Sequence, residues 1–281
     1  ALQKYGIIYS RLANPTVAAF EERIASLEGG LGAVATASGL SAQYITFASL
    51  CQAGDHIVAS ANLYGGSITQ LDVTLRRFGI ETTFVNSSDP ADYAAAITDK
   101  TKVIYAETIA NPSGEVADIE GLADVARAHE IPLFIDSTIA TPYLCRPIEW
   151  GADVVVHSAT KFLGGHGTTL GGVVVESGRF HWHSDKFPLF DQVVPSYGGL
   201  TWAGNFGEYA FLTRLRAEQL RDIGPVLAAH SAFLLAQGVE TVPYRMQAHI
   251  DNAREVANWL AQDSRIEFVN WAGLPSHPHY E

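Results

Sequence analysis

The sequence places a lysine, Lys161, among hydroxyl residues and glycines in the stretch Val156-His157-Ser158-Ala159-Thr160-Lys161-Phe162-Leu163-Gly164-Gly165-His166-Gly167. Residues 153–156 lead into this stretch, and they form a short β-branched run that predicts a buried strand. Lysines mostly occupy solvated surfaces. A lysine that directly follows a buried strand is therefore expected at a strand end, with its amine facing a cleft.

Composition restricts the class of protein. The chain has 281 residues, 47% of them hydrophobic, which suits one large α/β domain, or one domain and part of a second. A formal net charge of -12 argues against nucleic acid or an anionic membrane surface as the main partner. Cys51 and Cys145 form no CxxC pair, which favours a reducing cytoplasm. The sequence shows no apolar run long enough to span a bilayer and no signal-peptide pattern at its start.

Between residues 14 and 161, helical stretches alternate with short apolar strands. This alternation predicts an α/β fold in which a mostly parallel sheet is sandwiched by helices, with ligand chemistry at the carboxyl ends of the strands. Asn14 is expected to cap the first helix, and Gly29 and Gly30 to end it. The expected strands are residues 56–59, 81–85, 103–106, 133–135, 154–156 and 172–175. Further helices are expected at residues 40–52, 67–78, 89–97 and 118–129.

The part of the chain after residue 176 follows a different pattern. Residues 180–202 form a loop rich in aromatic residues, long enough to indicate a functional or interface element. Helices are expected at residues 206–221, 225–237 and 242–262, with Gly238 as a break before the last of them. Residues 266–269 predict a strand that opens a second domain.

These patterns predict three parts. We expect residues 1–13 to be the end of an N-terminal arm and residues 14–240 to be a large ligand-binding domain. Residues 241–281 are expected to begin a smaller C-terminal α/β domain that is incomplete here.

Asp136 and Lys161 form the most informative pair. Asp136 ends one predicted strand, and Lys161 lies 25 residues later (161 minus 136), just past the next one. Neighbouring strands would bring both side chains to one edge of the sheet. Pyridoxal 5'-phosphate requires an amine that can condense with its aldehyde and a carboxylate that can pair with its protonated ring nitrogen. Either residue alone is better explained as a loop-capping aspartate or a surface lysine, but the pair in this order favours the cofactor.

A phosphate site is predicted at the start of the second helix. Ser38, Gly39 and Leu40 stand there, and the backbone amides and dipole of a helix N-terminus favour an anion. Ser158 and Thr160 add hydroxyl groups beside the lysine. An N-cap serine followed by a turn glycine explains the first two residues equally well.

Aromatic residues near these motifs have less specific explanations. Tyr64 precedes a predicted helix and offers a face for a flat cofactor, although loop packing is the commoner role of such a residue. Tyr9 and Arg11 form an exposed pair near the N-terminus that has no local explanation.

Two other kinds of site are not supported. His181 with His183, and His277 with His279, lie in separate loops without a supporting Cys or Glu cluster, so we predict no metal site. The glycines at residues 30 and 32 follow a predicted helix, whereas a nicotinamide-binding loop follows a strand.

Together these residues resemble the pyridoxal-phosphate enzymes of cysteine and methionine metabolism, the cystathionine γ-synthase group of fold type I. The resemblance covers essentially the whole chain, and its motifs are jointly very specific. The motifs are Tyr9-Ser10-Arg11, Asn14-Pro15-Thr16, Ser38-Gly39-Leu40, Tyr64-Gly65-Gly66, Asn111-Pro112, Asp136 with Ala140-Thr141-Pro142, and Ser158-Ala159-Thr160-Lys161. Ser137 departs from the asparagine that usually follows the family aspartate, and we expect only a local change in hydrogen bonding.

The resemblance implies a role for each motif residue. Lys161 would bind the cofactor covalently, Asp136 would pair with the ring nitrogen, and Asn111 would contact the ring hydroxyl oxygen. Tyr64 would stack on the ring. The phosphate would be held by Gly39, Leu40, Ser158 and Thr160, and Ser38 would belong to the same cofactor site.

The resemblance also implies an assembly. Tyr9 and Arg11 resemble the pair that reaches into the phosphate site of a neighbouring subunit, which implies an active dimer and a tetramer made of two such dimers. Proton transfer would be assisted by Tyr64 and by the neighbour's Tyr9.

Within the family, the aromatic insertion and Arg221-Asp222-Ile223-Gly224 resemble the O-acetylhomoserine sulfhydrylases. The implied activity is γ-replacement, in which sulfide or a small thiol displaces acetate from O-acetyl-L-homoserine and gives homocysteine or methionine. Two alternative activities in the family stay open: cystathionine γ-synthase, and a methionine or cystathionine γ-lyase. A methionine γ-lyase is less favoured, because Gly66 stands where these enzymes usually carry a cysteine. A cofactor-binding protein without activity, kept for an interaction, also stays open. The arginine that binds the substrate carboxylate is expected beyond residue 281.

Overall fold

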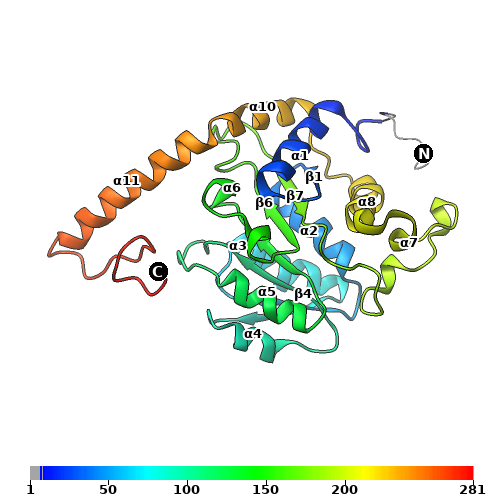
Figure 1. Ribbon diagram of the computed structural model, residues 1–281, viewed down its shortest axis with the longest axis horizontal. Coiled ribbons are helices and arrows are strands. Elements are labelled where there is room, and N and C mark those ends of the chain that lie inside the picture. Colours follow the sequence, from blue (N-terminus) through cyan, green and yellow to red (C-terminus); the bar gives the residue numbers. More distant parts are fainter. Residues whose placement is uncertain (1–6, 8, 281) are drawn as a thin grey trace.

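The computed structural model describes Ile7 and residues 9–280, and a seven-stranded sheet lies at its centre (Figure 1). The strand order is β1-β7-β6-β5-β4-β2-β3. Strands β2 to β6 run parallel, and β7 runs antiparallel to its neighbours β1 and β6. The strands are β1 (Gly32–Thr36), β2 (His56–Ser60), β3 (Glu81–Val85), β4 (Thr101–Glu107), β5 (Leu133–Asp136), β6 (Val154–His157) and β7 (Gly172–Glu176). The predicted mostly parallel sheet is confirmed.

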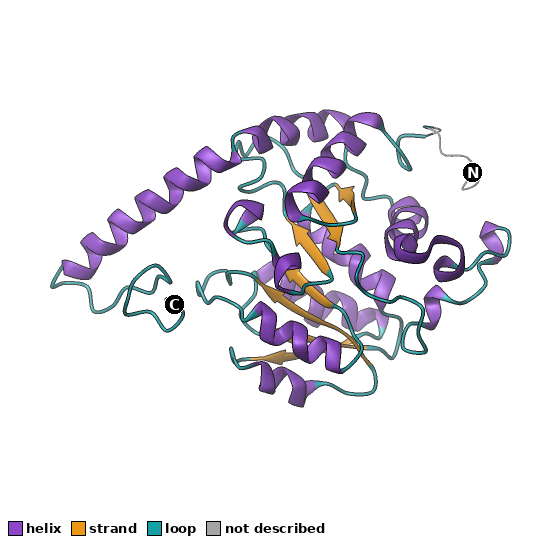
Figure 2. Ribbon diagram, viewed as in Figure 1, coloured by secondary structure: helices purple, strands orange, loops and turns teal. Residues whose placement is uncertain are grey.

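Helices cover both faces of this sheet (Figure 2). They are α1 (Pro15–Glu28), α2 (Gly39–Leu50), α3 (Gly65–Thr69), α4 (Pro90–Ala96), α5 (Ile119–Ala128), α6 (Thr141–Leu144), α7 (Trp202–Phe206), α8 (Ala210–Arg214), α9 (Arg221–Ile223), α10 (Ala229–Glu240) and α11 (Val242–Gln262). A π-helical segment at Gln70–Leu75 continues α3, and another at Leu215–Leu220 joins α8 to α9. Most of the predicted helices are therefore present, but two of them are divided.

The central strands are mostly apolar because both of their faces are buried. Phe134 and Ile135 are adjacent on β5, yet they belong to different core clusters. One cluster packs against α1, α5 and α10, and the other packs against α2 and α8. Burying one such side chain contributes about 1.5–3 kcal/mol, so this double-sided core stabilises the sheet edge that carries the site.

Helix α1 begins and ends where the sequence predicts. The Asn14 side chain accepts hydrogen bonds from the backbone N–H groups of Thr16 and Val17, at 3.0 and 3.4 Å. Gly29 ends the helix with φ 74°, a left-handed conformation that glycine adopts without steric cost. These two ends fix the direction in which the chain enters β1.

Two predictions about the second half of the chain are wrong. Gly238 does not break a helix, because it lies inside α10. A Cβ atom at this position would lie 2.0 Å from the carbonyl oxygen of Gly164, so the glycine permits close helix–loop packing. Residues 266–269 form no strand, and no strand in the described part of the chain lies beside them for pairing.

The aromatic residues of the loop at 180–202 pack into the core. Trp182 stacks on Phe211 of α8, with ring centroids 4.8 Å apart, and Phe190 is completely buried. The loop contains short 3₁₀ turns at Pro188–Phe190 and Pro195–Tyr197. Within this chain the aromatic side chains therefore act in packing.

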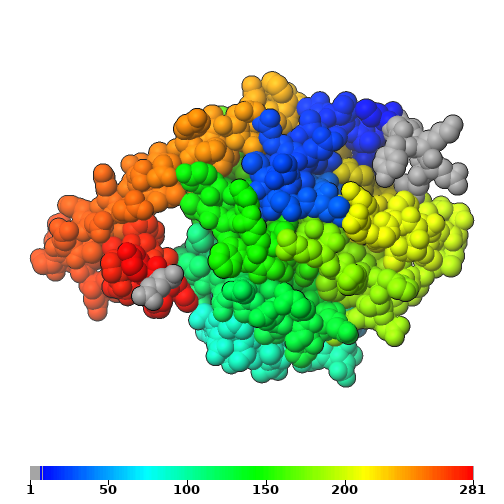
Figure 3. Space-filling view, viewed as in Figure 1, coloured from blue at the N-terminus to red at the C-terminus, as the bar shows by residue number. Residues whose placement is uncertain are grey.

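Helix α11 extends away from the body that holds the sheet (Figures 1 and 3). We propose that the boundary of the large domain lies between α10 and α11, at residue 240, with residues 1–13 as an arm and residues 241–281 as the start of the smaller domain. Among the residues described, no helix combines the length and the apolar character that crossing a bilayer requires.

Candidate active site

The site lies at the carboxyl edge of the sheet, where β5 and β6 end side by side. These strands pair in parallel, and Asp136 lies opposite Val156 in the register. Asp136 ends β5, and Lys161 follows the end of β6. Both line one cavity of about 390 Å³. The predicted convergence of these two residues at one edge is confirmed.

The cavity contains every predicted site residue except the N-terminal pair. Those that line it are Ser38, Gly39, Leu40, Tyr64, Asn111, Asp136, Ser158, Thr160 and Lys161. Tyr9 and Arg11 are absent from its lining. Arg11 Nη1 donates to the carbonyl oxygen of Arg221 at 3.0 Å, and Tyr9 is 57% exposed. A role for this pair in a neighbour's site stays a prediction.

The start of α2 forms one wall of the cavity. Ser38 caps the helix, and its hydroxyl oxygen accepts a hydrogen bond from Ser41 N at 3.1 Å. A Cβ atom on Gly39 would lie 2.6 Å from Ser158 Cβ, so only glycine lets the helix approach the end of β6 this closely. Ser38 is thus an N-cap that also lines the cavity, and the helix N-terminus presents its favourable dipole there.

Asp136 is held by neutral donors. Thr138 N donates to Oδ1 at 2.9 Å, and Gln43 Nε2 donates to Oδ2 at 3.0 Å. Burial raises the pKa of this carboxyl group above its ordinary value, against the lowering effect of the Thr138 hydrogen bonds. Among the described residues, no lysine or arginine forms an ion pair with Asp136. A cationic ligand group is therefore the partner that would favour its ionised form.

Lys161 has a fixed backbone and an exposed side chain. Its N–H donates to Ser158 O at 3.1 Å, and its carbonyl oxygen accepts from Gly165 N at 2.8 Å. From α11, Arg245 Nη1 donates to Phe162 O at 2.7 Å, and Nη2 donates to Leu163 O at 3.1 Å. The turn is thereby held while the amine stays accessible from the cavity.

The two hydroxyl residues beside the lysine differ. The Thr160 hydroxyl donates to Gly171 O and accepts from Gly171 N, each at 3.1 Å. Ser158 N donates to Thr138 Oγ1 at 2.8 Å, and within the described part of the chain Ser158 Oγ makes no hydrogen bond. The Ser158 hydroxyl is therefore the one still available to a ligand.

Three polar residues of the cavity were not predicted from the sequence: Gln43, Glu107 and Thr138. Glu107 ends a parallel strand, as Asp136 does, so the same strand-end rule would have found it. Gln43 is 3% exposed within a mainly apolar helix, and a buried amide in that setting indicates a polar partner. No comparable feature of the sequence points to Thr138.

The two histidine pairs lie outside the cavity. His183 Nδ1 lies 2.5 Å from Asp191 Oδ1, and the His277 and His279 rings are 5.5 Å apart. Within the described ranges, no group of three or more His, Cys, Asp or Glu side chains is placed to hold a metal ion.

Comparison with known families assigns the chain to one of them. The whole chain, residues 1–281, matches the family described as Cys/Met metabolism PLP-dependent enzyme. The chain belongs to this family. The sequence resemblance and the predicted cofactor, pyridoxal phosphate, are thereby confirmed.

Similar proteins of this family are sulfhydrylases. Sulfhydrylase FUB7 from Fusarium oxysporum f. sp. lycopersici is 52% identical over 282 residues, which cover 99% of this chain and 65% of that protein. O-acetyl-L-homoserine sulfhydrylase from Leptospira meyeri is 45% identical over 287 residues, with the same coverage of 99% and 65%. The chain thus spans slightly less than two thirds of the length of these relatives.

A solved structure supports the fold assignment. A protein from Campylobacter jejuni, assigned as an O-acetylhomoserine (thiol)-lyase, superimposes with a TM-score of 0.95 at 36% identity. The likeness covers 99% of this chain and 70% of that one. That structure carries an N'-pyridoxyl-lysine-5'-monophosphate residue. The predicted fold class is confirmed.

Proposed function

We propose that the protein catalyses γ-replacement on O-acetyl-L-homoserine, with sulfide or a small thiol as the incoming group. The observation that carries this proposal is the meeting of Asp136 and Lys161 in one cavity at the carboxyl edge of the sheet. The names of the similar sulfhydrylases support the choice of substrate. The expected products are acetate and either homocysteine or methionine.

The residues of the cavity fit pyridoxal phosphate. The α2 N-terminus suits the phosphate, because Gly39 brings it close to Ser158. Asp136, which has no cationic partner in the described residues, suits the protonated ring nitrogen. The exposed Lys161 amine suits the aldehyde, and Tyr64 offers an aromatic face for the ring.

When bound, the cofactor supplies an electron sink for the pair released at the substrate Cα. The Lys161 amine removes a proton from Cα and then one from Cβ, and it returns protons to both carbons after the sulfur has added. The Asp136 carboxylate keeps the proton on the ring nitrogen. With the Cβ proton removed, the Cγ–O bond breaks and acetate leaves with the electron pair of that bond. The C–S bond then forms at Cγ with the electron pair of the incoming thiolate.

The proposed phosphate contacts are divided between the start of α2 and the turn after β6. The backbone amides of Gly39 and Leu40 receive the oxygens at the helix N-terminus. The free Ser158 hydroxyl donates directly, whereas Thr160 supports the loop through Gly171. Ser38 fixes the helix start through its cap.

We also propose an active homodimer, paired into a tetramer, in which Tyr9 and Arg11 complete the neighbour's phosphate site. Their position outside their own cavity supports this arrangement. Mixed Lys161→Ala and Arg11→Ala subunits should regain activity that neither has alone, because one site of the hybrid dimer is intact. We also propose that the protein works in a reducing cytoplasm, because Cys51 and Cys145 are free.

Product analysis tests the reaction. Protein loaded with pyridoxal phosphate is supplied with O-acetylhomoserine and, separately, with sulfide, methanethiol or cysteine. We expect homocysteine with sulfide and methionine with methanethiol. Cystathionine as the only product would instead assign a cystathionine γ-synthase, and a keto acid formed without any acceptor would assign a γ-lyase.

A further inference from the structure

Glu107 is a buried carboxylate for which the described residues provide no ion-pair partner. It ends β4, is 7% exposed and lines the cofactor cavity. Its Oε1 accepts a hydrogen bond from Tyr64 N at 2.7 Å, and its Oε2 accepts one from Asn111 N at 2.9 Å. Both oxygens are therefore occupied by backbone donors.

These two donors belong to different loops. Tyr64 follows β2 and stands at the start of α3, and Asn111 follows β4. Because β2 and β4 are paired neighbours, both loops emerge at the same edge of the sheet. Both side chains line the cavity, so Glu107 spans two elements that face one ligand.

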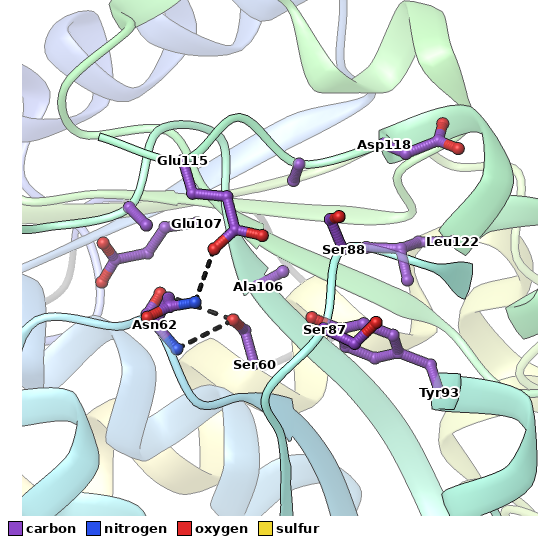
Figure 4. Close-up of a pocket in the computed structure, with 12 residues that line it drawn as sticks. Ser60, Asn62, Ser87, Ser88, Tyr93, Ala106, Glu107, Glu115, Asp118 and Leu122 are labelled. Carbon is purple, nitrogen blue, oxygen red and sulfur yellow. Dashed lines mark hydrogen bonds between the residues drawn. The ribbon is translucent and has the colours of Figure 1, made fainter. Parts of the chain in front are cut away.

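A second bridge joins the same two loops behind Glu107. Asn62 Nδ2 donates to Glu115 Oε2, and Ser60 Oγ accepts from Asn62 N at 3.0 Å (Figure 4). These residues surround a small polar cavity, which Glu107 also lines. This second bridge joins Asn62 to Glu115, whereas Glu107 binds the backbone of Tyr64 and Asn111, whose side chains line the cofactor cavity.

We propose that Glu107 is a positioning residue, which holds the Tyr64 and Asn111 loops at a fixed separation so that both side chains meet the same cofactor ring. The inference rests on the proposed function. It assigns to Glu107 no contact with the substrate and no proton transfer.

The chemistry of the site explains why a carboxylate is used. The Glu107 pKa is raised to about 7, mainly by burial and next by the charge of Asp136. The two backbone hydrogen bonds oppose this rise. The two N–H groups reach different oxygens of Glu107, and a carboxylate offers two acceptor oxygens on one side chain. A glutamine would turn its NH₂ group toward one of the loop amides and leave that amide unpaired.

The test compares Glu107→Gln with Glu115→Gln as a matched control. Glutamine at residue 115 keeps an oxygen that can accept from Asn62. Amide hydrogen exchange is measured on the protein without cofactor, at residues 62–66 and 109–113. The affinity for pyridoxal phosphate and the visible circular dichroism of the bound cofactor are then measured on both variants.

In Glu107→Gln we expect exchange to rise about tenfold in at least one of the two segments, with cofactor binding weakened by about the same factor and the visible dichroism reduced. The Glu115→Gln protein should resemble the wild type. If Glu107→Gln showed the same exchange, affinity and dichroism as the wild type, the inference would be overturned and the proposed function would stay intact. A wild-type protein that binds no pyridoxal phosphate would overturn both.

Discussion

The side-chain amide of Gln43 donates to Asp136 Oδ2 over 3.0 Å, which joins α2 to the end of β5. The same Nε2 group also donates to the Tyr105 hydroxyl, and Ser67 Oγ donates to Gln43 Oε1 at 3.1 Å. One helix thus carries, at its start, the residues that we propose to face the phosphate and, one turn later, the residue that orients the carboxylate proposed to pair with the ring nitrogen.

Replacing Gln43 should weaken cofactor binding. The Gln43→Ala variant removes a charge-assisted hydrogen bond from Asp136, and we expect the dissociation constant of pyridoxal phosphate to rise about tenfold. Equilibrium titration of the protein without cofactor measures this constant. Gln219→Ala is the control, because Gln219 also contacts α2, through Ala48 O at 3.4 Å. Equal effects of the two substitutions would refute a specific role for Gln43.

The glycines after Lys161 should differ in their tolerance of a side chain. Gly165 has φ 73°, and a Cβ atom there would lie 2.4 Å from the Arg245 guanidinium carbon. Gly167 has φ 66° but has no atom within 4 Å of such a Cβ. We expect Gly167→Ala to cost about 1–2 kcal/mol of unfolding free energy from backbone strain, and Gly165→Ala to cost about 1–2 kcal/mol more.

Denaturant unfolding of both glycine variants gives these free energies. A further variant, Arg245→Ala, should lower stability by itself, because the hydrogen bonds to Phe162 O and Leu163 O are lost. In that background the extra cost at Gly165 should disappear. If it persisted, the clash with Arg245 would not be its cause.

Glu176 should make stability depend on pH. Burial raises the pKa of this carboxyl group from 4.5 to about 8, and its Oε1 accepts a hydrogen bond from Trp182 Nε1. Between these two pKa values the folded protein retains a proton that the unfolded chain has released. Stability from this residue is therefore full below the lower value and is lost as the pH rises toward the higher one.

The Glu176→Gln variant should remove this dependence, because an amide keeps an acceptor for Trp182 and carries no proton to lose. Relative to the variant, we expect the wild type to lose about 2–4 kcal/mol between about pH 5 and about pH 8. Thermal or denaturant unfolding across this range measures the difference. The exposed Glu267→Gln substitution is the control and should leave the wild-type slope. Parallel curves for wild type and Glu176→Gln would exclude the effect.

The strand-end residues were predictable because local patterns determine them. Short apolar runs located β5 and β6, and parallel pairing then placed Asp136 and Lys161 at one edge. Glu107 obeys the same rule, but its importance depends on two loop amides that are distant in sequence from each other. Such partners become visible only when the loops are placed in space.

The errors arose where tertiary packing outweighs local propensity. Gly238 is an unfavourable helix residue, yet it lies within α10 because a side chain there would collide with Gly164 O. Residues 266–269 have an apolar pattern, but a strand also needs a partner. The Gln43–Asp136 contact joins residues 93 positions apart, and no pattern in a single sequence specifies that pairing.

The most direct test of the whole account locates the cofactor on the chain. The protein is loaded with pyridoxal phosphate, reduced with borohydride and digested, and the labelled peptide is identified by mass spectrometry. We predict the pyridoxyl label on Lys161, and no label at this position in Lys161→Ala. A label on Lys100, Lys102 or Lys186 in the wild type, or no label at all, would contradict the proposed site and the reaction built on it.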